Sequence, residues 1–79
     1  MRIEMLEDIF EEAKRDGADI CVEITIPGQD DTEFIINRNK SLDNKLNYYK
    51  SAYDKNCIHK NNESIKIVSA TAIEFNCEI

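Results

Sequence analysis

Residues 19–37 have the sequence DICVEITIPGQDDTEFIIN, which holds the strongest secondary-structure signals of the chain. Over residues 19–26, Ile or Val occupies every even position, and this period of two predicts a strand with its aliphatic side chains on one face. Pro27 and Gly28 then end the strand and favour a tight turn. Residues 32–37 predict a second strand, so the two strands form a hairpin.

The second strand also alternates, with large apolar residues at positions 34 and 36. We expect Phe34 and Ile36 to face the core. Glu33, Ile35 and Asn37 would then lie on the opposite face of the strand.

A helix is predicted over residues 2–16, immediately before the hairpin. Acidic residues are frequent in its first turns, basic residues end it, and Gly17 can adopt the left-handed conformation that stops a helix. Its apolar residues recur at spacings of three and four and form one stripe. The stripe consists of Met5, Leu6, Ile9, Phe10 and Ala13.

A second helix is predicted over residues 41–55, followed by a polar loop over residues 55–63 and a third strand over residues 64–76. The apolar stripe of this helix consists of Leu42, Leu46, Tyr49 and Tyr53. Tyr48 points away from the stripe and is a candidate surface contact. The third strand is apolar on both faces, which indicates either a central strand or a bend near residues 69–71.

The element order α-β-β-α-β predicts an α+β fold, with residues 1–79 forming one small domain. We expect a mainly antiparallel sheet of order 2-1-3, with two helices on one face. The alternative places the third strand parallel to the second. The other face of the sheet is left open, and it is either solvated or an interface. We expect that face to carry Cys21, Glu23, Thr25, Glu33, Ile35 and Asn37.

The charge balance argues against binding to polyanions. The 79 residues include 16 acids and 10 Lys or Arg, for a net charge of −6. Nucleic acids and anionic membranes attract basic proteins, so neither is an expected direct partner. The acidic start does not resemble an export signal, no apolar run approaches the ~20 residues of a membrane span, and three cysteines do not suggest a disulfide framework. We therefore expect a cytoplasmic protein.

The sequence carries no recognisable catalytic motif, and we expect neither an enzyme nor a cofactor. The chain has only two glycines, too few for a glycine-rich phosphate loop. Cys57 and His59 are the only close Cys/His pair, whereas a zinc site needs three or four ligands. We interpret this pair as a loop thiol beside an exposed imidazole, with no metal bound.

Charge is concentrated in the first half of the chain. Residues 1–36 hold eleven acids and three bases, a net charge of −8. Such a surface could imitate a row of phosphates and occupy a basic nucleic-acid channel. The alternative is a solvated acidic helix that keeps a small protein soluble. The candidate partner-binding residues are Glu4, Glu7, Asp8, Glu11, Glu12, Glu23, Asp30, Asp31 and Glu33.

Three segments give the chain a resemblance to short uncharacterised proteins of phages and prophages in low-GC Gram-positive bacteria. These segments are Phe34-Ile35-Ile36-Asn37, Lys45-Leu46-x-Tyr48-Tyr49-Lys50-x-Ala52-Tyr53 and Ile65-Lys66-Ile67-Val68. The resemblance implies an accessory phage protein. An acidic helix followed by a small sheet is also similar in style to the anti-CRISPR inhibitors, acidic mimics that block DNA binding by a Cas effector. The resemblance assigns no role to individual residues.

Our leading hypothesis is a non-enzymatic phage protein that inhibits a host nucleic-acid-binding defence complex of the CRISPR type. The alternative hypothesis is a self-associating assembly module, a homodimer formed through the open sheet face or an edge strand. Ile35 and the apolar residues Phe75 and Ile79 near the C-terminus favour that alternative.

Overall fold

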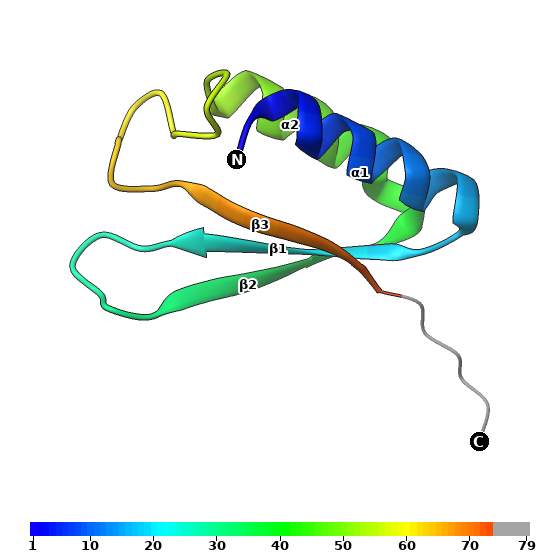
Figure 1. The fold of residues 1–79 in the computed structure, drawn as a ribbon, viewed down its shortest axis with the longest axis horizontal. Coiled ribbons are helices and arrows are strands. Elements are labelled where there is room, and N and C mark those ends of the chain that lie inside the picture. The colour runs from blue at the N-terminus through cyan, green and yellow to red at the C-terminus, as the bar shows by residue number, and fades with distance from the viewer. Residues whose placement is uncertain (74–79) are drawn as a thin grey trace.

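The computed structural model describes residues 1–73 as two layers, a three-stranded sheet and two helices on one of its faces (Figure 1). The elements are α1 (Ile3–Asp16), β1 (Asp19–Thr25), β2 (Thr32–Asn37), the 3-10 helix η1 (Asn39–Ser41), α2 (Leu42–Ala52) and β3 (Ile67–Ile73). The predicted α+β class and element order are confirmed. The last residues predicted for the third strand, 74–76, lie outside the described residues, as do Phe75, Cys77 and Ile79.

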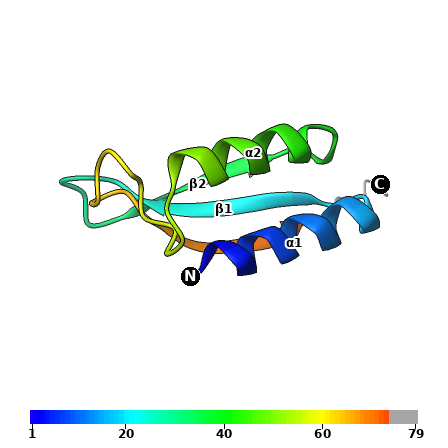
Figure 2. The ribbon, with the colours of Figure 1, turned by 90° about the horizontal axis from the view of Figure 1, so that it is seen from above.

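The strand order is β2-β1-β3, and β1 pairs antiparallel with both neighbours. This confirms the predicted order 2-1-3, and the parallel alternative is wrong. Viewed from the helix side, α2 lies over β2 and α1 lies over β3 (Figure 2). Both helices therefore cover the same face, and no helix of residues 1–73 lies on the opposite face (Figure 1).

The first helix forms where its pattern predicts, but Met5, assigned to its apolar stripe, is 53% exposed because it lies to one side of the face that packs on the sheet. Leu6, Phe10 and Ala13 are buried in the core. The helix ends at Gly17, whose φ of 71° is left-handed and whose N–H donates to the carbonyl of Ala13. A left-handed residue is common after a helix because it lets the last free carbonyls find donors, and glycine adopts that conformation without a Cβ clash.

The core lies between the helices and the sheet. It contains Leu42, Leu46, Tyr49 and Tyr53, the predicted stripe of the second helix, although Tyr53 falls just after the last helical residue. The aliphatic residues at positions 20, 22 and 24 of β1 are also buried, as predicted. Two ion pairs join the helices across the top of this core, Lys14 with Asp43 and Lys50 with Glu7, the latter at 3.0 Å.

The predicted orientation of β2 is wrong. Ile20 pairs with Asn37 and Val22 pairs with Ile35, and directly paired residues share a face of the sheet. Because the even residues of β1 face the helices, the odd residues of β2 do too. Asn37 is fully buried, whereas Phe34 and Ile36 point away from the core with 66% and 47% of their surface exposed.

A buried polar side chain explains why β2 tolerates this orientation. The Tyr49 hydroxyl donates to Oδ1 of Asn37 at 3.1 Å. The Asn37 amide nitrogen donates to the carbonyls of Ile20 at 3.3 Å and Ile35 at 3.2 Å. Since a buried amide is costly only when its hydrogen bonds are unmade, Asn37 can occupy a core position.

β3 is an edge strand, so the predicted alternative of a central position is wrong. Its apolar residues fall on both faces because its pairing with β1 shifts by one residue. The register with β1 shifts between Glu23 and Ile24, so that Ile67 pairs with Ile24 and Ser69 pairs with Glu23. Val68 is the extra residue, and it is exposed. The bend therefore lies just before the predicted residues 69–71. It lets Ile67 and Ala70 both pack against the core.

The segment between α2 and β3 is more ordered than the predicted polar loop. Single bridges pair Tyr53 with His59 and Ile58 with Lys66. Cys57 lies in this connection, as predicted, but it has a left-handed φ of 60° and is fully buried, which the sequence did not indicate. The Cys57 N–H donates to the carbonyl of Asp54 at 3.0 Å, and the Cys57 carbonyl accepts from Ile67 N–H at 2.9 Å. Burial raises the pKa of the thiol.

The buried tyrosines predict a loss of stability at alkaline pH. Burial raises the pKa of Tyr49 and raises that of Tyr53 to about 12, against 10.0 for a free phenol. The folded state favours the neutral phenols. This contribution is complete below pH 10 and is lost as the pH rises from 10 towards 12. Thermal melts between pH 8 and 11.5 should show a falling Tm above pH 10, and the fall should be smaller in Tyr53→Phe. An equal fall in both proteins would contradict this assignment.

Candidate interaction surfaces

The outer side of α1 carries a row of carboxylates that we call the acidic ridge. Its members are Glu4, Asp8, Glu11 and Glu12, and all four are exposed. Except for the adjacent Glu11 and Glu12, they are three, four, seven or eight residues apart. They therefore lie along the side of the helix opposite Leu6 and Phe10. Successive members four residues apart are separated by about 6 Å along the helix axis.

Part of the charge of the ridge is balanced locally. Arg2 pairs with Glu4 at 3.3 Å, and Lys14 pairs with Glu11 at 3.3 Å while also contacting Asp43. A backbone hydrogen bond at the start of the helix, together with Arg2, lowers the pKa of Glu4. Within residues 1–73, Asp8 and Glu12 take part in no salt bridge. The ridge therefore keeps two unpaired carboxylates facing solvent.

The other five candidate acids lie elsewhere. Glu7 is turned towards α2 and pairs with Lys50. Asp30 and Asp31 lie in the exposed turn between β1 and β2. Glu33 is exposed and shares the helix-side face of β2 with Ile35, whereas Glu23 lies on the opposite face of the sheet. The fold thus gathers four of the nine candidates into one surface and separates the rest.

The face of the sheet opposite the helices, which we call the uncovered face, is more apolar than the sequence predicts. Of the six residues expected there, Cys21, Glu23 and Thr25 are present, but Glu33, Ile35 and Asn37 lie on the helix side because of the pairing register. Phe34 and Ile36 take their places. The uncovered face is formed by Asp19, Cys21, Glu23, Thr25, Thr32, Phe34, Ile36, Ser69, Thr71 and Ile73.

Glu23 occupies the middle of the uncovered face and is held there by hydroxyl groups. Thr32 Oγ1 donates to Oε2 of Glu23 at 2.5 Å, and Ser69 Oγ donates to Oε1 at 2.9 Å. These two hydrogen bonds, the one from Thr32 first, lower the pKa of Glu23. The carboxylate is therefore fixed across all three strands, with Phe34 directly beside it on β2.

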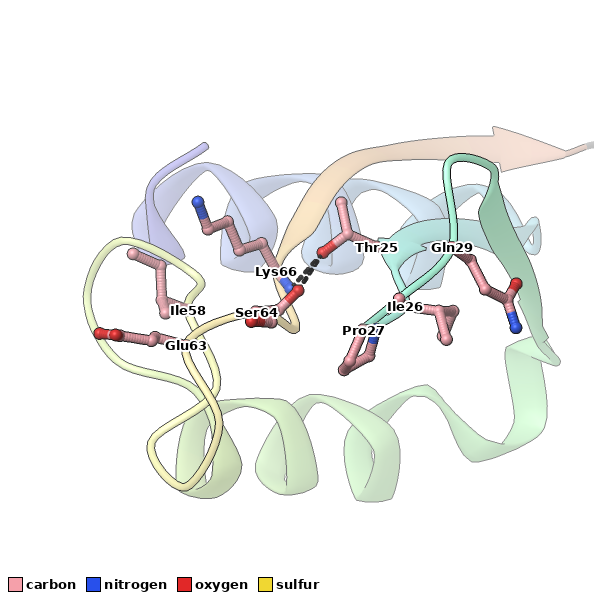
Figure 3. A pocket seen from close by; sticks show the side chains of 9 residues that line it. Thr25, Ile26, Pro27, Gln29, Ile58, Glu63, Ser64 and Lys66 are labelled. Atoms are coloured by element: carbon pink, nitrogen blue, oxygen red, sulfur yellow. Dashed lines mark hydrogen bonds between the residues drawn. The ribbon is translucent and has the colours of Figure 1, made fainter.

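An open hollow of about 540 Å³ lies between the β1–β2 turn and the segment before β3 (Figure 3). Its lining combines the apolar residues Ile26, Pro27 and Ile58 with Glu63 and Lys66. The Thr25 hydroxyl donates to the Ser64 carbonyl at 2.7 Å and accepts the Lys66 N–H at 3.0 Å. That hydroxyl is thus engaged in joining the two segments, and the hollow presents no paired nucleophile and base.

Cys57 and His59 do not converge on a common site. His59 Nδ1 accepts the backbone N–H of Asn61 at 3.1 Å, and its ring packs edge-on against Tyr53. Among residues 1–73, no three His, Cys, Asp or Glu side chains are grouped so that they could hold a metal ion. The two described helices also include none with the length and apolar character needed to cross a membrane.

The comparisons with known proteins point to no family for this fold and these surfaces. No family model matches the sequence, and no curated protein or solved structure gives a significant match. The functional argument therefore depends on the surfaces themselves.

Proposed function

We propose that this chain is a non-enzymatic binding protein that places the acidic ridge of α1 against a basic surface of a host protein. The observation that carries the proposal is the exposed row of four carboxylates, in which Asp8 and Glu12 form no salt bridge with any described residue. A rigid helix presents these charges in a fixed row, which favours fast association with a complementary surface.

A nucleic-acid-binding complex is the partner class that this surface fits best. Such complexes bind phosphates through clustered Lys and Arg, and a row of carboxylates can compete for the same groups. The net charge of −6 keeps the chain itself away from nucleic acid. We infer an accessory phage protein that acts in the cytoplasm of its bacterial host on a defence complex of the CRISPR type. This inference also rests on the sequence resemblance to phage proteins.

Reversing two ridge charges tests this function. In Asp8→Lys/Glu12→Lys, the unpaired carboxylates become ammonium groups, so binding to a basic partner should weaken at least tenfold at low salt. The control is Asp30→Lys/Asp31→Lys, which makes the same change of charge in the β1–β2 turn, away from α1. All four positions are exposed, so both variants should fold.

The assay is rescue of a targeted plasmid in a low-GC Gram-positive host with an active CRISPR system. The natural sequence and the turn variant should restore transformation, and the ridge variant should not. A tagged chain should also capture the effector from the lysate and release it as salt rises. Equal rescue by both variants would place the binding surface elsewhere, and no rescue by the natural sequence would exclude this target.

A further inference from the structure

The uncovered face of the sheet is a second surface, on the other side of the molecule from the helices (Figure 1). Phe34 exposes 66% and Ile36 exposes 47% of its surface at adjacent same-face positions of β2. Cys21, opposite Ile36 on β1, is half-buried. Antiparallel sheets often leave one face in water, but that face is then mainly polar. Two large exposed apolar side chains side by side indicate a surface that is buried against a binding partner.

The low net charge of the uncovered face favours a second copy of this chain as its partner. Glu23 and Asp19 are its two charged residues at neutral pH. The Glu23 oxygens already accept hydrogen bonds from Thr32 and Ser69. Asp19 is buried and pairs with Arg38 at 3.1 Å, so its charge is balanced locally. Most of the other charges of this acidic chain lie on α1, α2 and the loops. An acidic surface would repel its own copy, whereas a nearly neutral, apolar and hydroxyl-bearing face is complementary to itself.

We propose that the uncovered face binds the same face of a second copy of this chain, related by a two-fold axis. Two antiparallel sheets pack face to face at a separation of about 10 Å. The dimer would have four layers, with the helices of each copy outside and the two sheets inside. The acidic ridges would remain exposed, so the dimer is compatible with the proposed function but does not depend on it.

The size of the face predicts a weak dimer. Three strands spaced about 4.8 Å apart and about 3.3 Å per residue give a face of roughly 15 by 20 Å. The area covered on the two copies together falls below the ~1,200 Å² of a standard stable interface. We therefore expect a monomer–dimer equilibrium with a Kd of tens to hundreds of micromolar, and not an obligate dimer.

Glu23 supplies a test that is specific for a second copy. Because each copy contributes its own Glu23, the two-fold axis brings two like charges to the middle of the interface. Glu23→Gln removes both charges and retains an oxygen that can accept a hydroxyl. At a separation of about 10 Å, removal of this repulsion should tighten the dimer roughly three- to tenfold. Phe34→Thr removes two aromatic rings from each dimer and should weaken it at least tenfold.

Sedimentation equilibrium from 10 µM to 1 mM measures these effects directly. Met5→Gln is the matched control, because Met5 is 53% exposed on α1, on the helix side, and should leave the Kd unchanged. Threonine suits an exposed strand position and glutamine an exposed helix position, so both variants should fold. A monomer at 1 mM would overturn the proposal. A dimer that Phe34→Thr leaves unchanged would also overturn it.

Alkylation of Cys21 locates the interface. In a Cys77→Ser background, the remaining thiols are Cys21 on the uncovered face and the fully buried Cys57. The rate at which iodoacetamide modifies Cys21 should fall several-fold as protein concentration rises through the Kd. It should stay constant in Phe34→Thr. Self-association without protection of Cys21 would place the contact on an edge strand or on the helices and would contradict this assignment.

Discussion

Phe10→Ala should lower the free energy of unfolding by about 3–5 kcal/mol, the cost of deleting a large buried ring. A domain of 79 residues has a total stability of roughly 4–12 kcal/mol, so this single change removes much of it or all of it. Phe10 is fully buried and packs edge-on against Tyr49, with ring centroids 6.0 Å apart. The cavity would therefore open where α1 meets α2.

Urea unfolding followed by circular dichroism measures this loss. Met5→Ala is the control on the same helix, because Met5 is largely exposed, and it should change stability by no more than about 0.5 kcal/mol. The helix propensity of alanine is high at both positions, so the difference between the variants reports burial. Similar losses in the two variants would show that α1 does not pack through Phe10.

Asn37→Leu should cost about 1–3 kcal/mol, although it replaces a polar core residue by an apolar one of similar size. The Tyr49 hydroxyl would lose the acceptor that it contacts at 3.1 Å, and a leucine cannot replace it. The carbonyls of Ile20 and Ile35 would lose a donor. Each unsatisfied buried group opposes folding, because in the unfolded chain it bonds to water.

A double-mutant cycle separates the hydrogen bond from the shape of the side chain. Tyr49→Phe removes the hydroxyl that Asn37→Leu leaves without an acceptor. The loss of unfolding free energy in the double variant should therefore be about 1 kcal/mol smaller than the sum of the two single losses. Asn44→Leu, on the exposed side of α2, is the control for the change of residue type and should be nearly neutral. Strict additivity of Asn37→Leu and Tyr49→Phe would mean that the hydrogen bond contributes nothing.

The two surfaces differ in how far the sequence predicted them. The acidic ridge follows from helical periodicity alone, since burial of Leu6 and Phe10 turns Asp8 and Glu12 outward. The uncovered face was only partly predicted. The residues of β1 on this face were predicted correctly. Phe34 and Ile36 were wrongly assigned to the core, because hydrophobicity was the only signal available for β2.

The orientation of β2 depends on the number of residues in the hairpin connection, because this number sets which residues pair. Thr25 pairs with Thr32, which leaves six residues in the connection and pairs every even residue of β1 with an odd residue of β2. A hairpin whose connection has an odd number of residues would instead pair even with even. The sequence between Ile26 and Asp31 does not determine which two residues form the last strand pair before the turn. The packing of the strands against the rest of the protein also influences that pairing.

The sequence by itself determined the local elements, their order and the charge of each segment, because these depend on periodicity, capping and composition within a few residues. The tertiary structure decided which face of β2 is buried, where β3 shifts its register and that Cys57 and Asn37 belong to the core. Each of these depends on a partner distant in the chain: Tyr49 for Asn37, Ile67 for Cys57 and β1 for both edge strands. No window of neighbouring residues contains that information, since a strand with apolar side chains on both faces can turn either way until its partners are in place.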